Sequence, residues 1–147
     1  MKQYLNFLRD FRPVKGYDGE VPNFVDVVLS DVHDKPGVYI ITSDTTRFVY
    51  PKGTSKVIYI GKADDIRRRL KEHQCLLCSA FNDPYDEIWH SDKYKYMQYH
   101  GANVIYYLCL GNQNAKDLES DIIRKFYLKY GAMPVGNGAR SFHKEEY

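Results

Sequence analysis

The sequence predicts an α/β (α+β) fold in which a small, three-stranded, mainly antiparallel sheet is flanked by helices. Three observations point to this class. Two short runs of apolar and aromatic residues lie at 37–42 and 57–61, and a third apolar run rich in β-formers spans 104–110. Apolar residues at helical spacing follow the second and third runs. The 147 residues are 44% hydrophobic and 27% charged, which is typical of one globular domain with a single core.

Residues 1–35 are expected to form an N-terminal extension packed on the core, and residues 36–147 form the domain proper. Pro13 interrupts the extension, and the apolar run 24–29 after Pro22 is predicted to begin a short helix. The chain has no low-complexity tract, and both parts are expected to make one compact unit.

The first two strands are expected to pair as a hairpin, which residues 48–53 extend through a proline–glycine turn. Because side chains alternate along a strand, Ile58 and Ile60 should share one face of the second strand and Tyr59 should occupy the other. In the first strand, Val38 and Ile40 should share one face and Tyr39 should occupy the other. Both phenols should therefore point the same way.

A basic helix should follow over 65–74, with Asp64 as its N-cap. Arg69 and His73 are four residues apart, so they share a helix face beside the apolar stripe.

Residues 91–99 are predicted to form a helix that ends at Gly101. The run 104–110 is expected to be a central strand covered on both faces. The last helix should begin after the cap Asn114 and end at Gly131.

The charge balance argues against a protein that holds nucleic acid by bulk charge. The net charge is only +2, from 21 basic and 19 acidic residues, so any phosphate contact must come from a local cluster. No apolar run reaches membrane-spanning length, residues 1–4 lack a signal-peptide pattern, and three cysteines cannot all pair within one chain. These features predict a cytoplasmic location.

Short motifs occur in a fixed order along the chain. The tripeptide Gly-Val-Tyr at 37–39 and Tyr-Ile-Gly at 59–61 precede Arg69, which lies ten residues after Tyr59; Glu119 follows in the last helix, and Pro-Val-Gly-Asn stands at 134–137. Together these residues resemble the GIY-YIG nuclease superfamily over roughly residues 35–137. Valine replaces the usual isoleucine of the first motif, the spacer between the motifs is longer than in compact members, and nothing resembles an attached DNA-reading module.

The resemblance implies a divalent-metal-dependent DNA endonuclease, with RNA not excluded as a substrate. It assigns catalytic roles to Tyr39, Tyr59, Arg69, His73 and Glu119. Glu119 would also be the metal ligand, holding one Mg²⁺ or Mn²⁺ ion per site, which suits a cation that takes one or two carboxylates plus water and phosphate oxygens.

The residue types suit phosphodiester hydrolysis. Arg69 presents a fork of donors that matches phosphate oxygens, and Tyr39 is the candidate base for the attacking water. A free phenol has a pKa of about 10, so nearby cations such as Lys62, Arg69 or the metal must lower it. The residues expected to contact the substrate or support that contact are Gly61, Lys62, Arg67, Arg68 and Asn137.

Two other patterns have simpler interpretations. Cys75 and Cys78 have zinc-ligand spacing, with Cys109 or His100 as a further ligand, but no second pair follows and buried free thiols are common. The tyrosines at 94, 96 and 99 are expected to serve packing or an interface rather than base stacking.

Two alternative functions remain open. One is a nucleic-acid-binding module on a nuclease scaffold with little catalysis, and the other is a protein-interaction scaffold. Since a lone domain of charge +2 should hold duplex DNA weakly, a homodimer or a targeting partner is expected to assist binding.

Overall fold

The computed structural model describes residues 7–8, 18–82 and 92–137. Its strands are β1 (Gly19–Val21), β2 (Gly37–Thr42), β3 (Phe48–Tyr50), β4 (Gly53–Ser55), β5 (Val57–Ala63) and β6 (Asn103–Leu108). Its helices are α1 (Ile66–Asn82), α2 (Asp92–His100) and α3 (Ala115–Tyr130).

The main sheet has the strand order β1-β6-β2-β5, and every neighbouring pair is antiparallel. The α+β class predicted from the sequence is confirmed. The three expected strands are β2, β5 and β6, and β1 from the N-terminal part adds a fourth strand beside β6. Strand β6 is therefore central, as its continuous apolar run indicated.

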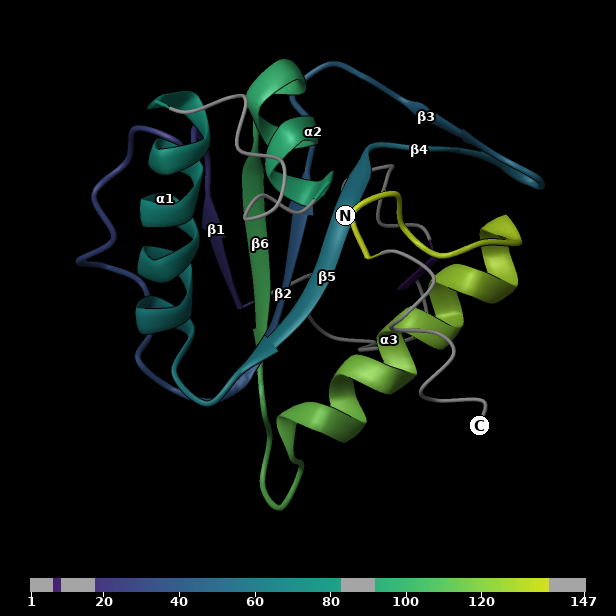
Figure 1. Cartoon of the computed structure of the whole chain (residues 1–147). Helices are drawn as coiled ribbons and strands as arrows, with labels where there is room; N and C mark the ends of the chain where they lie inside the picture. Colours follow the sequence, from purple (N-terminus) through teal and green to yellow (C-terminus); the bar gives the residue numbers. More distant parts are fainter. Residues whose placement is uncertain (1–6, 9–17, 83–91, 138–147) are drawn as a thin grey trace.

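The sheet lies between two helical layers (Figure 1). Helices α1 and α2 cover one face and α3 covers the other. Two buried clusters match these layers: one centred on Tyr39, Ile41 and Leu70 lies under α1 and α2, and one centred on Val38, Ile40 and Phe126 lies under α3. Successive side chains of β2 therefore pack alternately into the two buried clusters.

The prediction for strand β5 is wrong in one respect. Ile41 pairs with Tyr59 but Thr42 pairs with Val57, so Ile58 is an extra residue at a register shift. Ile58 therefore packs in the cluster under α1 together with Tyr59, whereas Ile60 packs under α3. Ile58 and Ile60 do not share a face, because the shift interrupts the alternation between them.

Residues 24–29 do not form the predicted helix; they make a turn and then an irregular segment. Phe24 is fully buried and its amide donates to the Ala102 carbonyl. The Gln74 side chain donates to the carbonyls of Phe24 and Val27, at 2.7 and 2.9 Å. Backbone groups that would form hydrogen bonds within a helix are thus bonded to residues from distant parts of the chain.

Helix α1 is longer than predicted, and its cap differs. The Asp65 side chain, not Asp64, accepts a hydrogen bond from the Arg68 amide at 3.0 Å. The helix continues past Gln74 because Leu77 extends the buried row. His73 lies within that row rather than beside it.

The predicted ends of α2 and α3 are confirmed. Gly101 and Gly131 follow α2 and α3 with left-handed backbones, and Asn114 caps α3 by accepting from the Asp117 amide. Residues 48–53 do not extend the β2–β5 ribbon as predicted, because β3 and β4 pair with each other in a separate two-stranded sheet. This hairpin of β3 and β4 leaves the main sheet (Figure 1). The Lys52 amide at its turn donates to the Tyr130 carbonyl, which ties the hairpin to the end of α3.

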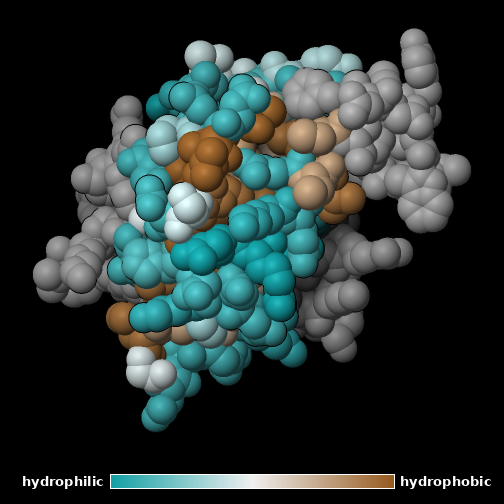
Figure 2. All heavy atoms as spheres, turned by 90° about the vertical axis from the view of Figure 1, so that its left-hand side faces the viewer, coloured by the Kyte–Doolittle hydropathy of each residue, from teal (hydrophilic) through white to brown (hydrophobic). Residues whose placement is uncertain are grey.

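The face formed by α1 is mostly hydrophilic, with apolar side chains gathered in small patches (Figure 2). Leu76 on α1 and Val28 in the preceding irregular segment are among the exposed apolar residues. In the ranges that the structure describes, no helix has the length and apolar character needed to cross a membrane.

Candidate active site

The two motif tyrosines lie on the same face of the sheet, as strand alternation predicted. Tyr39 is opposite Gly61, and Tyr59 is opposite Ile41 in the β2–β5 ladder. The ring centroids of Tyr39 and Tyr59 are 6.1 Å apart, and both rings pack under α1. The hairpin therefore presents a pair of phenols to α1.

Gly61 makes room for these phenols. A Cβ at this position would overlap the Tyr39 hydroxyl and crowd the Tyr59 ring. Gly61 is predicted from the sequence to contact the substrate or to support that contact, whereas in the structure the tyrosines occupy the space that a side chain would need. The glycine is required for packing whether or not a phosphate binds here.

Helix α1 brings Arg69 and His73 to the tyrosines. Arg69 is partly exposed, and its guanidinium forms an ion pair with Glu72 at 2.8 Å. Burial lowers the pKa of Arg69, but hydrogen bonds and charge interactions with Glu72 and Tyr39 raise it above the ordinary value. Arg69 is thus a permanent cation beside Tyr39, with part of its surface open to a ligand.

His73 is fully buried and connects two tyrosines. Its Nε2 is 2.6 Å from the Tyr39 hydroxyl, and its Nδ1 is 2.6 Å from the Tyr94 hydroxyl. Burial, together with the charges of Arg69 and Lys93, lowers the pKa of His73 to about 3. The ring is therefore neutral at physiological pH, with one nitrogen donating and the other accepting.

Tyr39 and Tyr59 are weak acids in the free protein. Burial raises the pKa of Tyr39 well above its ordinary value, Tyr59 raises it further, and Arg69 lowers it through charge and a hydrogen bond. Burial also raises the pKa of Tyr59; the charge of Glu119 acts in the same direction, and Arg69 and a hydrogen bond from Tyr39 act against it. Ionising either phenol requires additional positive charge.

Helix α2 contributes Lys93 and Tyr94 to the site, and neither belongs to the sequence motifs. Lys93 Nζ lies 4.3 Å from the centre of the Tyr59 ring and 5.4 Å from that of Tyr94. Burial, and secondarily the charge of Arg69, lowers the pKa of Lys93 to about 8. No motif spacing marks Lys93 or Tyr94, because the packing of α2 against α1 and β5 brings them here.

Glu119 approaches the site from α3 on the other side of the sheet. It is half-buried, and its charge acts on Tyr59, which stands on the edge strand β5. No group of three or more His, Cys, Asp or Glu residues gathers among the described residues. One hard carboxylate oxygen, with phosphate and water completing the shell, matches the donor set that Mg²⁺ or Mn²⁺ takes in phosphoryl-transfer sites.

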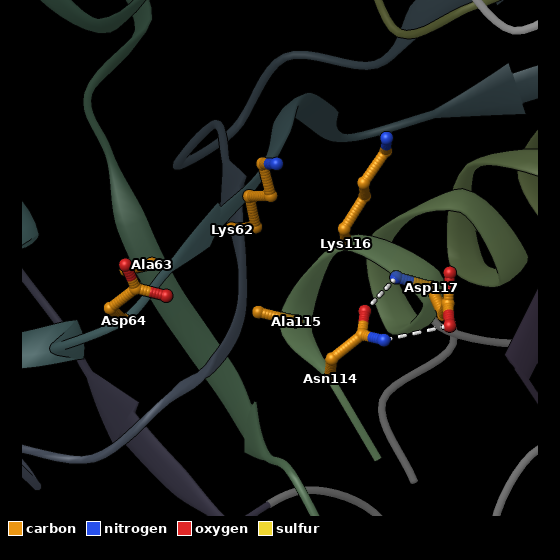
Figure 3. A pocket seen from close by; sticks show the side chains of 7 residues that line it. All are labelled: Lys62, Ala63, Asp64, Asn114, Ala115, Lys116 and Asp117. Carbon is orange, nitrogen blue, oxygen red and sulfur yellow. Dashed lines mark hydrogen bonds between the residues drawn. The ribbon is translucent and has the colours of Figure 1, made fainter.

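Lys62 lies on the opposite face of β5 from the tyrosines, because it follows Gly61 in the pleat. It lines a pocket of about 440 Å³ at the start of α3, together with Asp64, Asn114 and Lys116 (Figure 3). The expected effect of Lys62 on Tyr39 is absent: Arg69 is the cation that lowers the pKa of Tyr39. Lys62 and Lys116 bring positive charge to this pocket, and Asp64 and Asp117 bring negative charge to it.

Arg67 and Arg68 differ in position. Arg67 Nε donates to the Val32 carbonyl at 2.7 Å, so it anchors the segment that precedes β2. Arg68 is exposed and lines a shallow groove on α1 together with Arg69 and Glu72. The structure therefore brings Arg68 near Arg69 and commits Arg67 to an intramolecular contact.

Asn137 supports the edge strand. Its Oδ1 accepts from the Ile60 amide at 3.0 Å, and its Nδ2 donates to the Ile60 carbonyl at 2.8 Å. The Gly136 amide donates to the Ile58 carbonyl at 2.7 Å, and a Cβ on Gly136 would crowd that carbonyl and Lys93. Residues 136 and 137 thus hold β5 in position, and Gly136 lies against Lys93 beside the site.

Cys75 and Cys78 are exposed on α1 and form no disulfide, and Cys109 is partly buried. The zinc interpretation would need a cluster of three or more ligands, which the described residues do not contain.

Comparison with known proteins gives one match. The family model described as the GIY-YIG catalytic domain matches residues 35–130. Neither the curated proteins nor the solved structures gave a match. The matched range contains both tyrosine motifs, the arginine of α1 and the glutamate of α3, and it covers more than half of the chain. The chain therefore belongs to the GIY-YIG nuclease superfamily.

Proposed function

We propose that this protein is a divalent-metal-dependent endonuclease that hydrolyses phosphodiester bonds of DNA. The observation that carries the proposal is the convergence of Tyr39, Tyr59, Arg69 and His73 from three elements, with the charge of Glu119 acting on Tyr59. Each residue type has a distinct task in phosphoryl transfer.

Arg69 and Lys93 stabilise the negative charge that grows on the phosphate. They lie on adjacent helices around the tyrosine pair, and each lowers the pKa of His73. Fixed positive groups in a partly desolvated site act strongly on a transition state because they need not reorganise. Arg69 also presents two parallel donors to phosphate oxygens.

Tyr39 accepts the proton of the attacking water, and Tyr59 orients the water or the phosphate. In the free protein the Tyr39 phenol is too weakly acidic for this role, so the phenolate depends on charge that arrives with the substrate complex. Arg69 already acts in the required direction. His73, neutral and hydrogen-bonded to Tyr39, holds that phenol in place.

Glu119 would hold the divalent cation. When bound, the cation acts as a Lewis acid on the scissile phosphate and the leaving oxygen. The charge of Glu119 acts on Tyr59 of the edge strand β5, which supports a cation position beside the two phenols.

Contacts beyond the scissile phosphate would be few. Lys62 and Lys116 at the pocket in Figure 3, and Arg68 on α1, are positioned for neighbouring phosphates. With a net charge of +2, the chain would hold DNA weakly and depend on self-association or a targeting partner.

The test is cleavage of supercoiled plasmid, linear, branched and single-stranded DNA, and a matched RNA, with and without Mg²⁺ or Mn²⁺. We expect metal-dependent nicking, and we expect Arg69→Ala and Glu119→Gln each to lower kcat by about 100- to 1000-fold. Lys129→Ala and Asp121→Asn, both on α3, are matched controls and should retain activity. Equal cleavage by wild type and Arg69→Ala would identify a contaminant.

The same assay separates the alternatives. DNA binding without cleavage in any metal would favour a binding module on a nuclease scaffold. The absence of salt-dependent DNA affinity would favour a protein-interaction scaffold.

A further inference from the structure

His73 takes part in two buried hydrogen bonds, and the donor in each depends on which ring nitrogen carries the proton. His73 lies between two hydroxyls at 2.6 Å, Tyr39 on β2 and Tyr94 on α2. A neutral imidazole carries one proton, so exactly one of its nitrogens can donate. Two arrangements are possible, and they place the proton of His73 on opposite sides of the ring.

In the first arrangement Tyr39 donates to Nε2, and Nδ1–H donates to the Tyr94 oxygen. The Tyr94 O–H must then find another acceptor. Tyr94 is 3% exposed, and within the described ranges His73 is its only hydrogen-bond partner. A buried hydroxyl proton without an acceptor costs about 1–3 kcal/mol.

In the second arrangement the Tyr94 O–H donates to Nδ1, and Nε2–H donates to the Tyr39 oxygen. The Tyr39 proton is then free to point toward the neighbouring Tyr59, whose ring centre is 6.1 Å from that of Tyr39 and whose pKa Tyr39 lowers. The Tyr94 and His73 donors each have an acceptor at 2.6 Å. The second arrangement is favoured because it gives the buried Tyr94 proton an acceptor.

We propose that Tyr94 is a positioning residue that holds His73 as its Nε2–H tautomer and thereby directs a hydrogen bond onto the Tyr39 oxygen. The proposal rests on the proposed nuclease function for its catalytic consequence. The Tyr39 oxygen then receives hydrogen bonds from both His73 and Arg69. Two donors on one phenol oxygen stabilise its ionised form, which is the form a base requires.

The charged groups around the ring agree with this role. Arg69 on α1 and Lys93 on α2 both disfavour a second proton on His73. Tyr39 and Tyr59 face the ring from the sheet, and Tyr94 faces it from α2. The histidine thus remains a neutral group whose orientation and tautomer, rather than its charge, affect Tyr39.

The tautomer is measured directly by two-bond ¹⁵N–¹H correlation spectra of the full chain at pH 7.5, with His73 assigned through His73→Gln. We expect the wild-type His73 proton on Nε2, and in Tyr94→Phe a shift of population toward Nδ1–H. Tyr96→Phe, also on α2, is the control and should leave the His73 signals unchanged. A wild-type ring protonated on Nδ1, or an unaltered tautomer in Tyr94→Phe, would overturn the proposal.

Kinetics tests the consequence. Tyr94→Phe should lower kcat by about 10- to 100-fold while the KM for DNA changes by less than about twofold, because the lost group acts on the base rather than on binding. A shifted tautomer with unchanged kcat would refute the positioning role. If wild type shows the Nε2–H tautomer but cleaves no DNA, the nuclease function fails and the tautomer assignment stands.

Discussion

His73 should make the folded protein sensitive to acid in a defined pH range. Burial and the nearby charges of Arg69 and Lys93 lower its pKa to about 3 in the folded chain, against about 6.5 in an unfolded one. At pH 7.5 both states hold a neutral ring. Below pH 6.5 the unfolded chain binds the proton first, so stability falls with pH until the folded ring also protonates near pH 3. At pH 5.0 the loss due to His73 alone is about 2 kcal/mol.

The measurement is urea unfolding followed by circular dichroism at pH 7.5 and 5.0, for wild type and His73→Gln. The variant should be less stable at pH 7.5, because it loses buried packing. Between pH 7.5 and 5.0, however, wild type should lose about 2 kcal/mol more than the variant, since the other titrating groups are common to both chains. An equal loss would show that His73 titrates near its ordinary pKa, and the assigned burial would be wrong.

Three further perturbations test other parts of the site. Gly61→Ala should destabilise the fold by about 1–3 kcal/mol in urea unfolding, because its methyl group would displace the Tyr39 hydroxyl; a neutral effect would mean that the phenols have room to move. Asn137→Ala should cost about 1–3 kcal/mol in the same assay by leaving the Ile60 amide and carbonyl without their side-chain partner, and a loss below about 0.5 kcal/mol would show that water replaces the amide. If Lys93 must be charged, wild-type cleavage should fall as the pH rises through about 8, whereas Lys93→Arg should retain activity at pH 9; parallel profiles for the two proteins would exclude Lys93 as the titrating group.

Local sequence patterns predicted most of the elements correctly. Helix α3 is the clearest example, since Asn114, Asp117 and Gly131 specify its ends through contacts within a few residues. The predictions failed where contacts with residues distant in the sequence determine the backbone conformation. Pro22 before an apolar run predicted a helix over residues 24–29, but the side chain of Gln74 and the backbone of Ala102 form hydrogen bonds with that segment instead. The register shift at Ile58 is likewise not visible in the continuous apolar run 57–60.

The candidate site likewise has features that local sequence patterns predict and features that depend on distant contacts. Alternation in the strands predicts that Tyr39 and Tyr59 point the same way, and the four-residue spacing in α1 predicts that Arg69 and His73 share a helix face. The structure brings these two faces together. The same alternation, followed one residue further, would have put Lys62 on the opposite face, where the structure has it.

The sequence by itself determined the family, the order of the elements and the residues that could take part in phosphodiester chemistry, because motif order and local periodicity are properties of the chain. Only the tertiary structure decided that α2 completes the site with Lys93 and Tyr94, that His73 is buried and neutral, and that Gly61 serves the tyrosines. Those features depend on which surfaces become buried and which side chains meet there. Residues far apart in the chain determine both the burial and the contacts.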